Sequence, residues 1–268
     1  MRSVLAIILV LSCLTSQAFA EEQPISFGTE VQEGFVRLGN ESLEVVTAPV
    51  DTENYGPLVT LAVAGGVALT YVFDEDIRNK LHGAGSGTLN TLADVGSGIG
   101  NPFVHLGLAA AVYGGGRLAS SAEWQETGMM LGEAVVLADA TSFILKQTIG
   151  RGRPFASNDK GSFRPLQFKS DYDSLPSMHT ASSFALASVM ASKTDNLAGK
   201  ALYYLGATFV GFSRIQKDKH WASDIILGAA IGELCGRVVT NYHAGKNRVA
   251  IAPLVSGDSA LLALVGRW

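Results

Sequence analysis

Three short motifs in the C-terminal half of the chain gather residue types that bind phosphate and break bonds to it. They are KQTIGRGRP (Lys146–Pro154), PSMH (Pro176–His179) and SRIQKDKHWASD (Ser213–Asp224). Together they supply permanent cations, histidines and one carboxylate, namely Lys146, Arg153, Arg214, His179, His220 and Asp224. Cationic side chains neutralise phosphoryl oxygens, and histidine serves as a nucleophile or as an acid–base group. The set therefore predicts chemistry on a phosphate ester.

The first motif follows a predicted helix. Lys146 ends that helix, because Gly150, Gly152 and Pro154 prevent it from continuing. The chain can then curl until Lys146 and Arg153 converge on one anion, and the planar guanidinium group matches two phosphate oxygens. A basic loop that only solvates a helix end is the alternative for this motif by itself.

The other two motifs place histidines at helix starts. Ser177 is a plausible N-cap, and His179 would lie in the first turn, where backbone N–H groups and the helix dipole favour an anion. His220 and Asp224 are four residues apart and would share a helix face, so the carboxylate can fix the tautomer of the ring. Arg214 lies just upstream. By itself, the second motif also fits a serine that only caps a helix. The third motif by itself also fits a surface His–Asp pair.

In order and spacing, the motifs resemble the pattern K-x6-RP, PS-x-H and SR-x5-H-x3-D of the type 2 phosphatidic acid phosphatase (PAP2) superfamily. That superfamily also includes bacterial non-specific acid phosphatases and vanadium haloperoxidases. The resemblance covers the motifs and the helical body from about residue 57 to residue 239. It implies an all-α fold with a six-helix core. It also implies a phosphatase that needs neither a metal nor a cofactor, since the three fixed cations supply the charge.

The resemblance also implies a role for each motif residue. His220 would be the nucleophile that forms a phosphohistidine, and Asp224 would orient it. His179 would protonate the leaving oxygen and then activate water. The phosphoryl oxygens would be held by Lys146, Arg153, Arg214 and Ser177, with help from backbone amides such as that of Met178.

Two residues need separate comment. Met178 stands where the family pattern has glycine, and its side chain would either narrow the mouth of the pocket or contact a lipid. Asp139 lies seven residues before Lys146, two helical turns away on a similar face. We expect it to form a structural ion pair with that lysine, with tuning of the lysine as the alternative.

The elements that must position these residues are mainly helical. The apolar periodicity predicts six helices, at residues 57–73, 101–113, 127–146, 179–192, 200–212 and 222–239. Two β-favouring runs at residues 248–255 and 260–268 predict a C-terminal hairpin. We therefore expect a polar, loosely structured lead-in at 21–55, a helical phosphatase domain at 56–240 and a hairpin appendage at 246–268.

The N-terminus predicts export. Arg2 precedes an apolar run that is too short to span a bilayer, and Ala18-Phe19-Ala20 is typical of a signal peptidase site. We therefore expect residues 1–20 to be a signal peptide and the mature protein to lie in the periplasm or cell envelope.

Composition narrows the possible partners. The chain of 268 residues is 47% hydrophobic and only 16% charged, more apolar than an ordinary soluble enzyme. Its net charge of −4 argues against a nucleic-acid partner. Only residues 57–73 are long and charge-free enough to suggest a membrane span. We expect membrane association, with the active site on the non-cytoplasmic side.

The leading hypothesis is an exported phosphatase that hydrolyses the phosphate monoester or pyrophosphate of a lipid. Phosphatidic acid, an isoprenyl pyrophosphate and lipid A are the substrates considered. A soluble non-specific acid phosphatase acting on small phosphate esters is one alternative. A vanadium haloperoxidase, with His220 as the metal ligand, is another. The oligomeric state is not predicted.

Overall fold

The computed structural model describes residues 27–83, 86–246, 249–256 and 259–266. The described residues form the following elements: α2 (Phe27–Thr47), η1 (Ala48–Val50), α3 (Gly56–Val72), α4 (Asp74–Gly83), α5 (Gly87–Ile99), α6 (Pro102–Leu118), α7 (Ala122–Ile149), η2 (Ser170–Tyr172), α8 (Met178–Ser192), α9 (Leu197–Gln216), α10 (Ala222–His243), β1 (Val249–Ser256) and β2 (Ser259–Gly266). The six expected helices correspond to α3 and α6 to α10, so the all-α fold is confirmed. The predicted signal peptide lies outside the described residues.

Three helices were not expected from the sequence. The lead-in at 21–55 was expected to be loosely structured, and this is wrong over α2. There Leu38 and Val45 lie seven residues apart on one helix face, and both pack against the hydrophobic core. The helix α4 begins with three acidic residues, which favour a helix N-terminus. The helix α5 begins at Gly87 and is capped by Ser86, whose hydroxyl accepts a hydrogen bond from the Leu89 amide.

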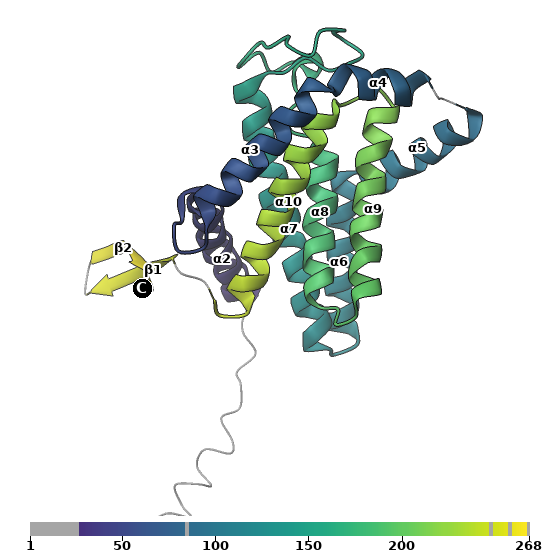
Figure 1. Cartoon of the computed structure of the whole chain (residues 1–268). Helices are drawn as coiled ribbons and strands as arrows, with labels where there is room; N and C mark the ends of the chain where they lie inside the picture. Colours follow the sequence, from purple (N-terminus) through teal and green to yellow (C-terminus); the bar gives the residue numbers. More distant parts are fainter. Residues whose placement is uncertain (1–26, 84–85, 247–248, 257–258, 267–268) are drawn as a thin grey trace, which may run out of the picture. The chain divides into compact units, whose positions relative to one another are not determined.

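The chain divides into two compact units, residues 1–37 and residues 38–268. In the second unit, the helices α6 to α10 lie side by side (Figure 1). The helix α10 packs against α8 and α7, and α6 packs against α7. A Cβ atom at Gly232 of α10 would lie only 2.1 Å from the Ala181 carbonyl oxygen of α8. Glycine at this position therefore allows the two helices that carry catalytic motifs to approach closely.

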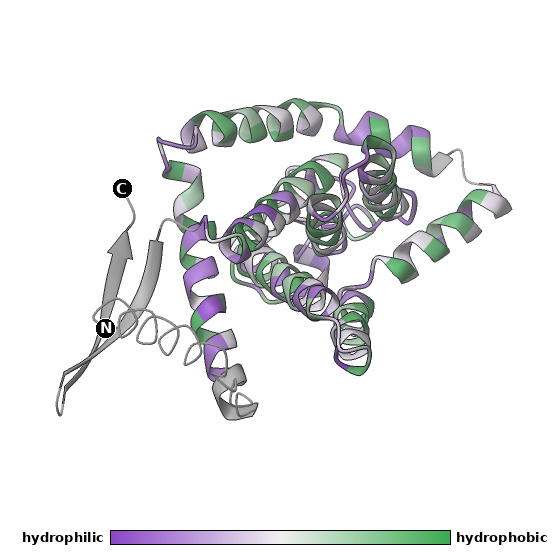
Figure 2. Ribbon diagram, turned by 90° about the horizontal axis from the view of Figure 1, so that it is seen from below, coloured by the Kyte–Doolittle hydropathy of each residue, from purple (hydrophilic) through white to green (hydrophobic). Residues whose placement is uncertain are grey.

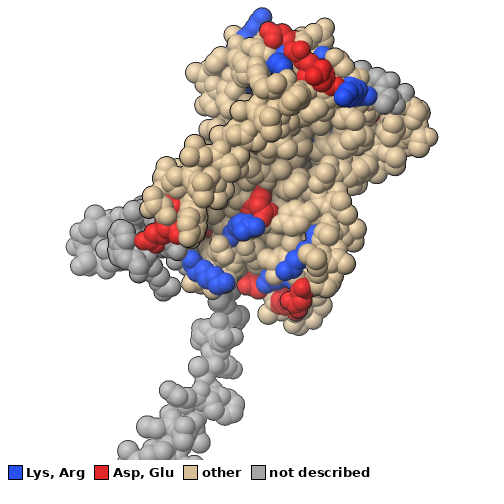
Figure 3. All heavy atoms as spheres, viewed as in Figure 1, with Lys and Arg blue, Asp and Glu red and all other residues tan. Residues whose placement is uncertain are grey.

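The surface of this bundle is unusually apolar. Figure 2 shows apolar residues along the helices of the bundle, and Phe103, Leu118 and Leu197 are each more than 80% exposed. On the face in Figure 3, charged side chains gather towards the two ends, and a belt without Lys, Arg, Asp or Glu lies between them. Such a belt is typical of a surface that contacts lipid or another apolar partner.

One helix among the described residues, α7, is long and apolar enough by itself to cross a membrane. The number rises to three if the bent pairs α3 with α4 and α5 with α6 each count as one span, with bends of 60° and 54°. The expectation that only residues 57–73 are long and charge-free enough for a membrane span is thus wrong. The 17 residues of α3 extend about 26 Å at 1.5 Å per residue, which is short of a hydrocarbon core of about 30 Å.

The strands β1 and β2 pair antiparallel, with Val249 opposite Gly266 and Ser256 opposite Ser259. They overlap the two runs in which the sequence analysis expects a hairpin, and each extends one residue beyond its run towards the turn.

Candidate active site

The loop after α7 begins with a turn that only glycine fits. Gly150 has φ +63°, and its N–H donates to the Lys146 carbonyl at 2.9 Å, which ends the helix. A Cβ atom at this position would lie 2.0 Å from the Arg164 carbonyl oxygen. The chain therefore folds back over the end of α7, where the Leu166 N–H donates to the Gln147 carbonyl at 2.8 Å.

The returning loop holds the two cations of the first motif. The ammonium group of Lys146, only 4% exposed, donates to the carbonyl oxygens of Asp173 and Ser174. The guanidinium of Arg153 donates through Nε to Asp173 Oδ1 at 2.6 Å. One residue, Asp173, thus positions both cations. The sequence analysis did not single out Asp173, and the binding of one anion by Lys146 and Arg153 stays a prediction.

The third motif brings His220 and Asp224 together, but not on one helix face as expected, because His220 lies in the loop before α10. The Nδ1 atom of His220 lies 3.5 Å from Asp224 Oδ2, and both side chains are buried. His220 is also held through its backbone, because its backbone N–H donates to the Arg214 carbonyl at 3.3 Å. With Nδ1 beside the carboxylate, Nε2 is the ring nitrogen left for reaction.

Asp224 is itself held by a buried network. Its Oδ2 atom accepts hydrogen bonds from the Ser174 hydroxyl at 2.5 Å and from the Trp221 N–H at 2.9 Å. Its Oδ1 atom accepts from Nη1 of Arg151 at 2.6 Å. Burial raises the pKa of Asp224, and the positive charge of Arg151 opposes that shift. The guanidinium therefore favours the ionised carboxylate, the form that can orient His220.

Arg151 also connects the active site to α4. Its Nη2 atom donates to Asp74 Oδ2 at 2.8 Å, and its Nη1 atom donates to the Ser223 hydroxyl at 2.7 Å. The same Asp74 carboxylate accepts from the Ser223 hydroxyl at 2.5 Å and from the Ser223 N–H at 2.9 Å. The guanidinium lies 5.4 Å from the Trp221 ring centroid. Asp74 is thus fully buried and holds the first turn of α10.

The second motif starts α8. Ser177 is the N-cap, and its Oγ atom accepts hydrogen bonds from the N–H and hydroxyl groups of Thr180 at 3.5 and 3.0 Å. Its own N–H donates to the Asp224 carbonyl at 3.0 Å, which ties α8 to α10. This confirms the predicted cap. The contact of Ser177 with a phosphate stays a prediction.

The cations and histidines lie within electrostatic range of one another. Burial, and then the charges of Arg214, Lys146 and Arg153, lower the pKa of His179 to about 3. Burial and the same three cations lower the pKa of His220 well below its ordinary value. Burial, with Arg153, lowers the pKa of Arg214 to about 10, so this guanidinium stays charged at neutral pH. The site combines fixed positive charge with neutral imidazoles, a setting that favours an anionic ligand.

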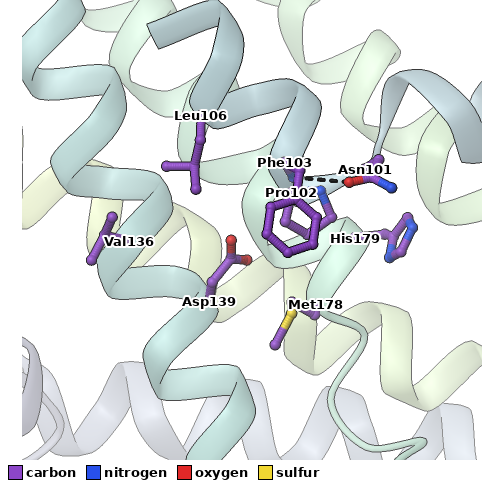
Figure 4. Close-up of a pocket in the computed structure, with 8 residues that line it drawn as sticks. All are labelled: Asn101, Pro102, Phe103, Leu106, Val136, Asp139, Met178 and His179. Carbon is purple, nitrogen blue, oxygen red and sulfur yellow. Dashed lines mark hydrogen bonds between the residues drawn. The ribbon is translucent and has the colours of Figure 1, made fainter. Parts of the chain in front are cut away.

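The expected ion pair between Asp139 and Lys146 is wrong. The lysine ammonium group points to the loop carbonyls of Asp173 and Ser174 instead. Asp139 lies seven residues earlier, about 10 Å along the helix axis. Its side chain faces a pocket of about 420 Å³ between α6, α7 and α8 (Figure 4). The lining residues are Asn101, Pro102, Phe103, Leu106, Val136, Asp139, Met178 and His179.

The sequence analysis expected the Met178 side chain either to narrow the mouth of the pocket or to contact a lipid. Met178 lines this pocket next to His179 (Figure 4). Its side chain therefore contributes to an apolar wall beside the catalytic motif, whichever ligand occupies the pocket.

The residues that sequence reasoning missed are Asp74, Arg151, Asp173, Ser174 and Trp221. Signals for three of them were present in the sequence. Arg151 stands two residues before Arg153 in the first motif, and Asp173-Ser174 comes just before PSMH. Nothing in the sequence linked Asp74 to residues about 150 positions away.

Comparisons with known proteins bear on this arrangement. The model of the PAP2 superfamily matches residues 127–248, which contain all three motifs. The chain is 30% identical over 187 residues to a lipid A 1-phosphatase of Porphyromonas gingivalis, which covers 67% of this chain and 37% of that protein. It is 31% identical over 107 residues to a lipid A 1-phosphatase of Rhizobium johnstonii, which covers 39% of this chain and 43% of that protein. The chain thus spans less than half the length of these relatives.

A solved structure shares the fold. It is a transmembrane PAP2-type phosphatidylglycerolphosphate phosphatase from Bacillus subtilis, with a TM-score of 0.53 and 20% identity over 74% of this chain and 97% of that chain. The matched segment contains the three motifs, and residues 127–248 therefore belong to the PAP2 superfamily.

Proposed function

We propose that the protein is a phosphatase that hydrolyses phosphate monoesters of lipids through a phosphohistidine intermediate. The observation that carries the proposal is the convergence of Lys146, Arg153 and Arg214 on two neutral histidines. Positioned positive charge and an in-line nucleophile are what phosphoryl transfer chiefly requires.

The proposed reaction has two steps. In the first, Nε2 of His220 attacks phosphorus, the bond from phosphorus to the alcohol oxygen breaks, and His179 gives its proton to that oxygen. In the second, His179 takes a proton from water, the water oxygen bonds to phosphorus, and inorganic phosphate leaves His220. Asp224 holds the ring of His220 and stabilises the positive charge that it acquires.

The depressed pKa of His179 fits this sequence of steps. Burial and the three cations keep the ring of His179 neutral when no anion offsets the positive charge. A bound phosphate dianion offsets that charge and raises the pKa of His179. The proton needed for the leaving oxygen is therefore taken up together with the substrate.

The preference for a lipid rests on three observations. The pocket beside His179 is lined mainly by apolar side chains. The outer surface of the bundle carries many exposed apolar residues. The similar proteins named above are a lipid A 1-phosphatase and a phosphatidylglycerolphosphate phosphatase. We infer that residues 56–240 form the catalytic domain and that it is membrane-associated, exported, and active on the non-cytoplasmic side.

The test is phosphate release by the purified chain in detergent with excess EDTA. Phosphatidic acid, an isoprenyl pyrophosphate and p-nitrophenyl phosphate are compared side by side. We expect release from the lipids to exceed release from the small ester. Because three cations supply the charge, EDTA should not reduce the rate, and a loss that magnesium restores would contradict this mechanism. Better turnover of the small ester would favour the non-specific acid phosphatase.

Two variants test the assignment of the site. His220→Ala should reduce release to below a few per cent of wild type without lowering the unfolding temperature. Lys217→Ala is the matched control, because this lysine belongs to the same motif but pairs with Asp94 outside the cluster. Substantial activity in His220→Ala would exclude the phosphohistidine. Membrane association is tested by alkaline extraction of cell membranes, and release of the chain into the soluble fraction would contradict it.

A further inference from the structure

The pocket beside His179 contains one carboxyl group in an otherwise mostly apolar lining. Asp139 projects from α7 towards Phe103 of α6 and Met178 of α8 (Figure 4). Its Oδ1 atom is buried and has no hydrogen-bond partner among the described residues. Burying an unpaired carboxylate oxygen lowers the free energy of unfolding, so Asp139 does not stabilise the fold at this position. The position is better explained by a ligand than by folding.

A second buried polar atom lies between this carboxylate and the phosphate-binding cations. Ser142 follows Asp139 by three residues and precedes Lys146 by four, so the three side chains share one face of α7. The Ser142 hydroxyl is also buried without a hydrogen-bond partner in the described part of the chain. One face of α7 thus carries polar side chains from the pocket to the cation cluster.

The orientation of the bound substrate follows from the proposed function. His179 belongs both to the electrostatic cluster around His220 and to the lining of the pocket. If His179 protonates the leaving oxygen, the alcohol part of the substrate lies on the side of His179 that faces the pocket. The first atoms beyond the scissile bond then pass Met178 and approach Asp139. The phosphate remains with the cations.

We propose that Asp139 is a specificity-determining residue that accepts a hydrogen bond from the alcohol part of the substrate. The substrate class is then a lipid phosphate whose alcohol carries a free hydroxyl or amide N–H near the ester, such as an acylated amino sugar or a glycerol headgroup. Phosphatidic acid has no such donor beside its phosphate, and a polyprenyl chain has none. A pyrophosphate would place its second anionic group next to the carboxylate, which repels it. This inference rests on the proposed function and narrows it.

The test compares kcat/KM for four lipids in the same detergent. A diacylglucosamine 1-phosphate and phosphatidylglycerol phosphate carry donors, whereas phosphatidic acid and a polyprenyl pyrophosphate do not. We expect the wild type to prefer the donor-bearing pair by roughly tenfold or more, the size expected for one hydrogen bond to a charged group. Asp139→Leu, which removes the acceptor but fills the space, should reduce that ratio to about one. Asp139→Asn keeps an acceptor oxygen and should restore part of the preference.

The matched control is Leu106→Ala, which opens the same pocket without touching a polar group. It should change all four rates together and leave the ratio unaltered. An unchanged ratio in Asp139→Leu, or a wild type that prefers phosphatidic acid, would overturn the role of Asp139 and leave the phosphatase in place. No release from any of the four lipids by the wild type would refute the proposed function, and this inference with it.

Discussion

Replacing Arg151 by methionine should both destabilise the protein and impair catalysis. The guanidinium is 1% exposed and is hydrogen-bonded to the fully buried carboxylates of Asp74 and Asp224. Removing one partner of a buried ion pair costs about 3–5 kcal/mol, because the remaining charge is left uncompensated. Here two carboxylates lose the same partner, so we expect a loss in the upper part of that range. This is a large share of a typical unfolding free energy of about 5–15 kcal/mol.

The catalytic effect of Arg151→Met follows from the pKa of Asp224. Burial raises this pKa and Arg151 lowers it, so the variant should have a still higher pKa. A protonated Asp224 is a poorer orienting group for His220. The acidic limb of the pH–rate profile should therefore move to higher pH, and activity at neutral pH should fall.

The assay is denaturant unfolding in detergent together with phosphate release as a function of pH. The double variant Arg151→Met with Asp74→Asn removes one of the two uncompensated charges and should recover part of the lost free energy. Arg164→Met is the matched control, since this exposed arginine of the same loop stacks on Tyr172 and should cost less than about 1 kcal/mol. Wild-type stability and an unshifted pH profile in Arg151→Met would refute the reasoning.

Three further predictions concern the same site. Stability should fall as the pH falls from about 6.5 towards 3, because unfolded histidines take up protons in this window while folded His179, with its pKa of about 3, does not. Thermal unfolding at a series of pH values measures this, a bound phosphate analogue should reduce the slope, and a flat profile would contradict it. Ser174→Ala removes a hydrogen bond to the Asp224 carboxylate and should cost about 1–3 kcal/mol in unfolding free energy and lower kcat, with Ser174→Thr retaining more of both. Unaltered kcat in Ser174→Ala would show that this bond does not position Asp224. Met178→Gly should enlarge the pocket beside His179 and change kcat/KM for lipids more than for p-nitrophenyl phosphate, whereas an equal change for both would place the side chain outside the lipid path.

Local features of the site were predictable from the sequence because they depend on neighbours along the chain. Gly150 ends α7, and Ser177 caps α8. Each of these follows from backbone geometry within one or two helical turns. The types and order of the motif residues likewise indicated phosphate chemistry before any fold was known.

Contacts between distant segments were decided only by the tertiary structure. Helix geometry put Asp139 and Lys146 on a similar face, but the returning loop offers the lysine two carbonyl oxygens and leaves the acid to the pocket. Asp74 reaches Arg151 and Ser223 only because α4 lies against the start of α10. Sequence periodicity reports which face of a helix is apolar, but not which helix or loop will cover it. That choice depends on how all the helices pack together, and it determines which buried charges meet.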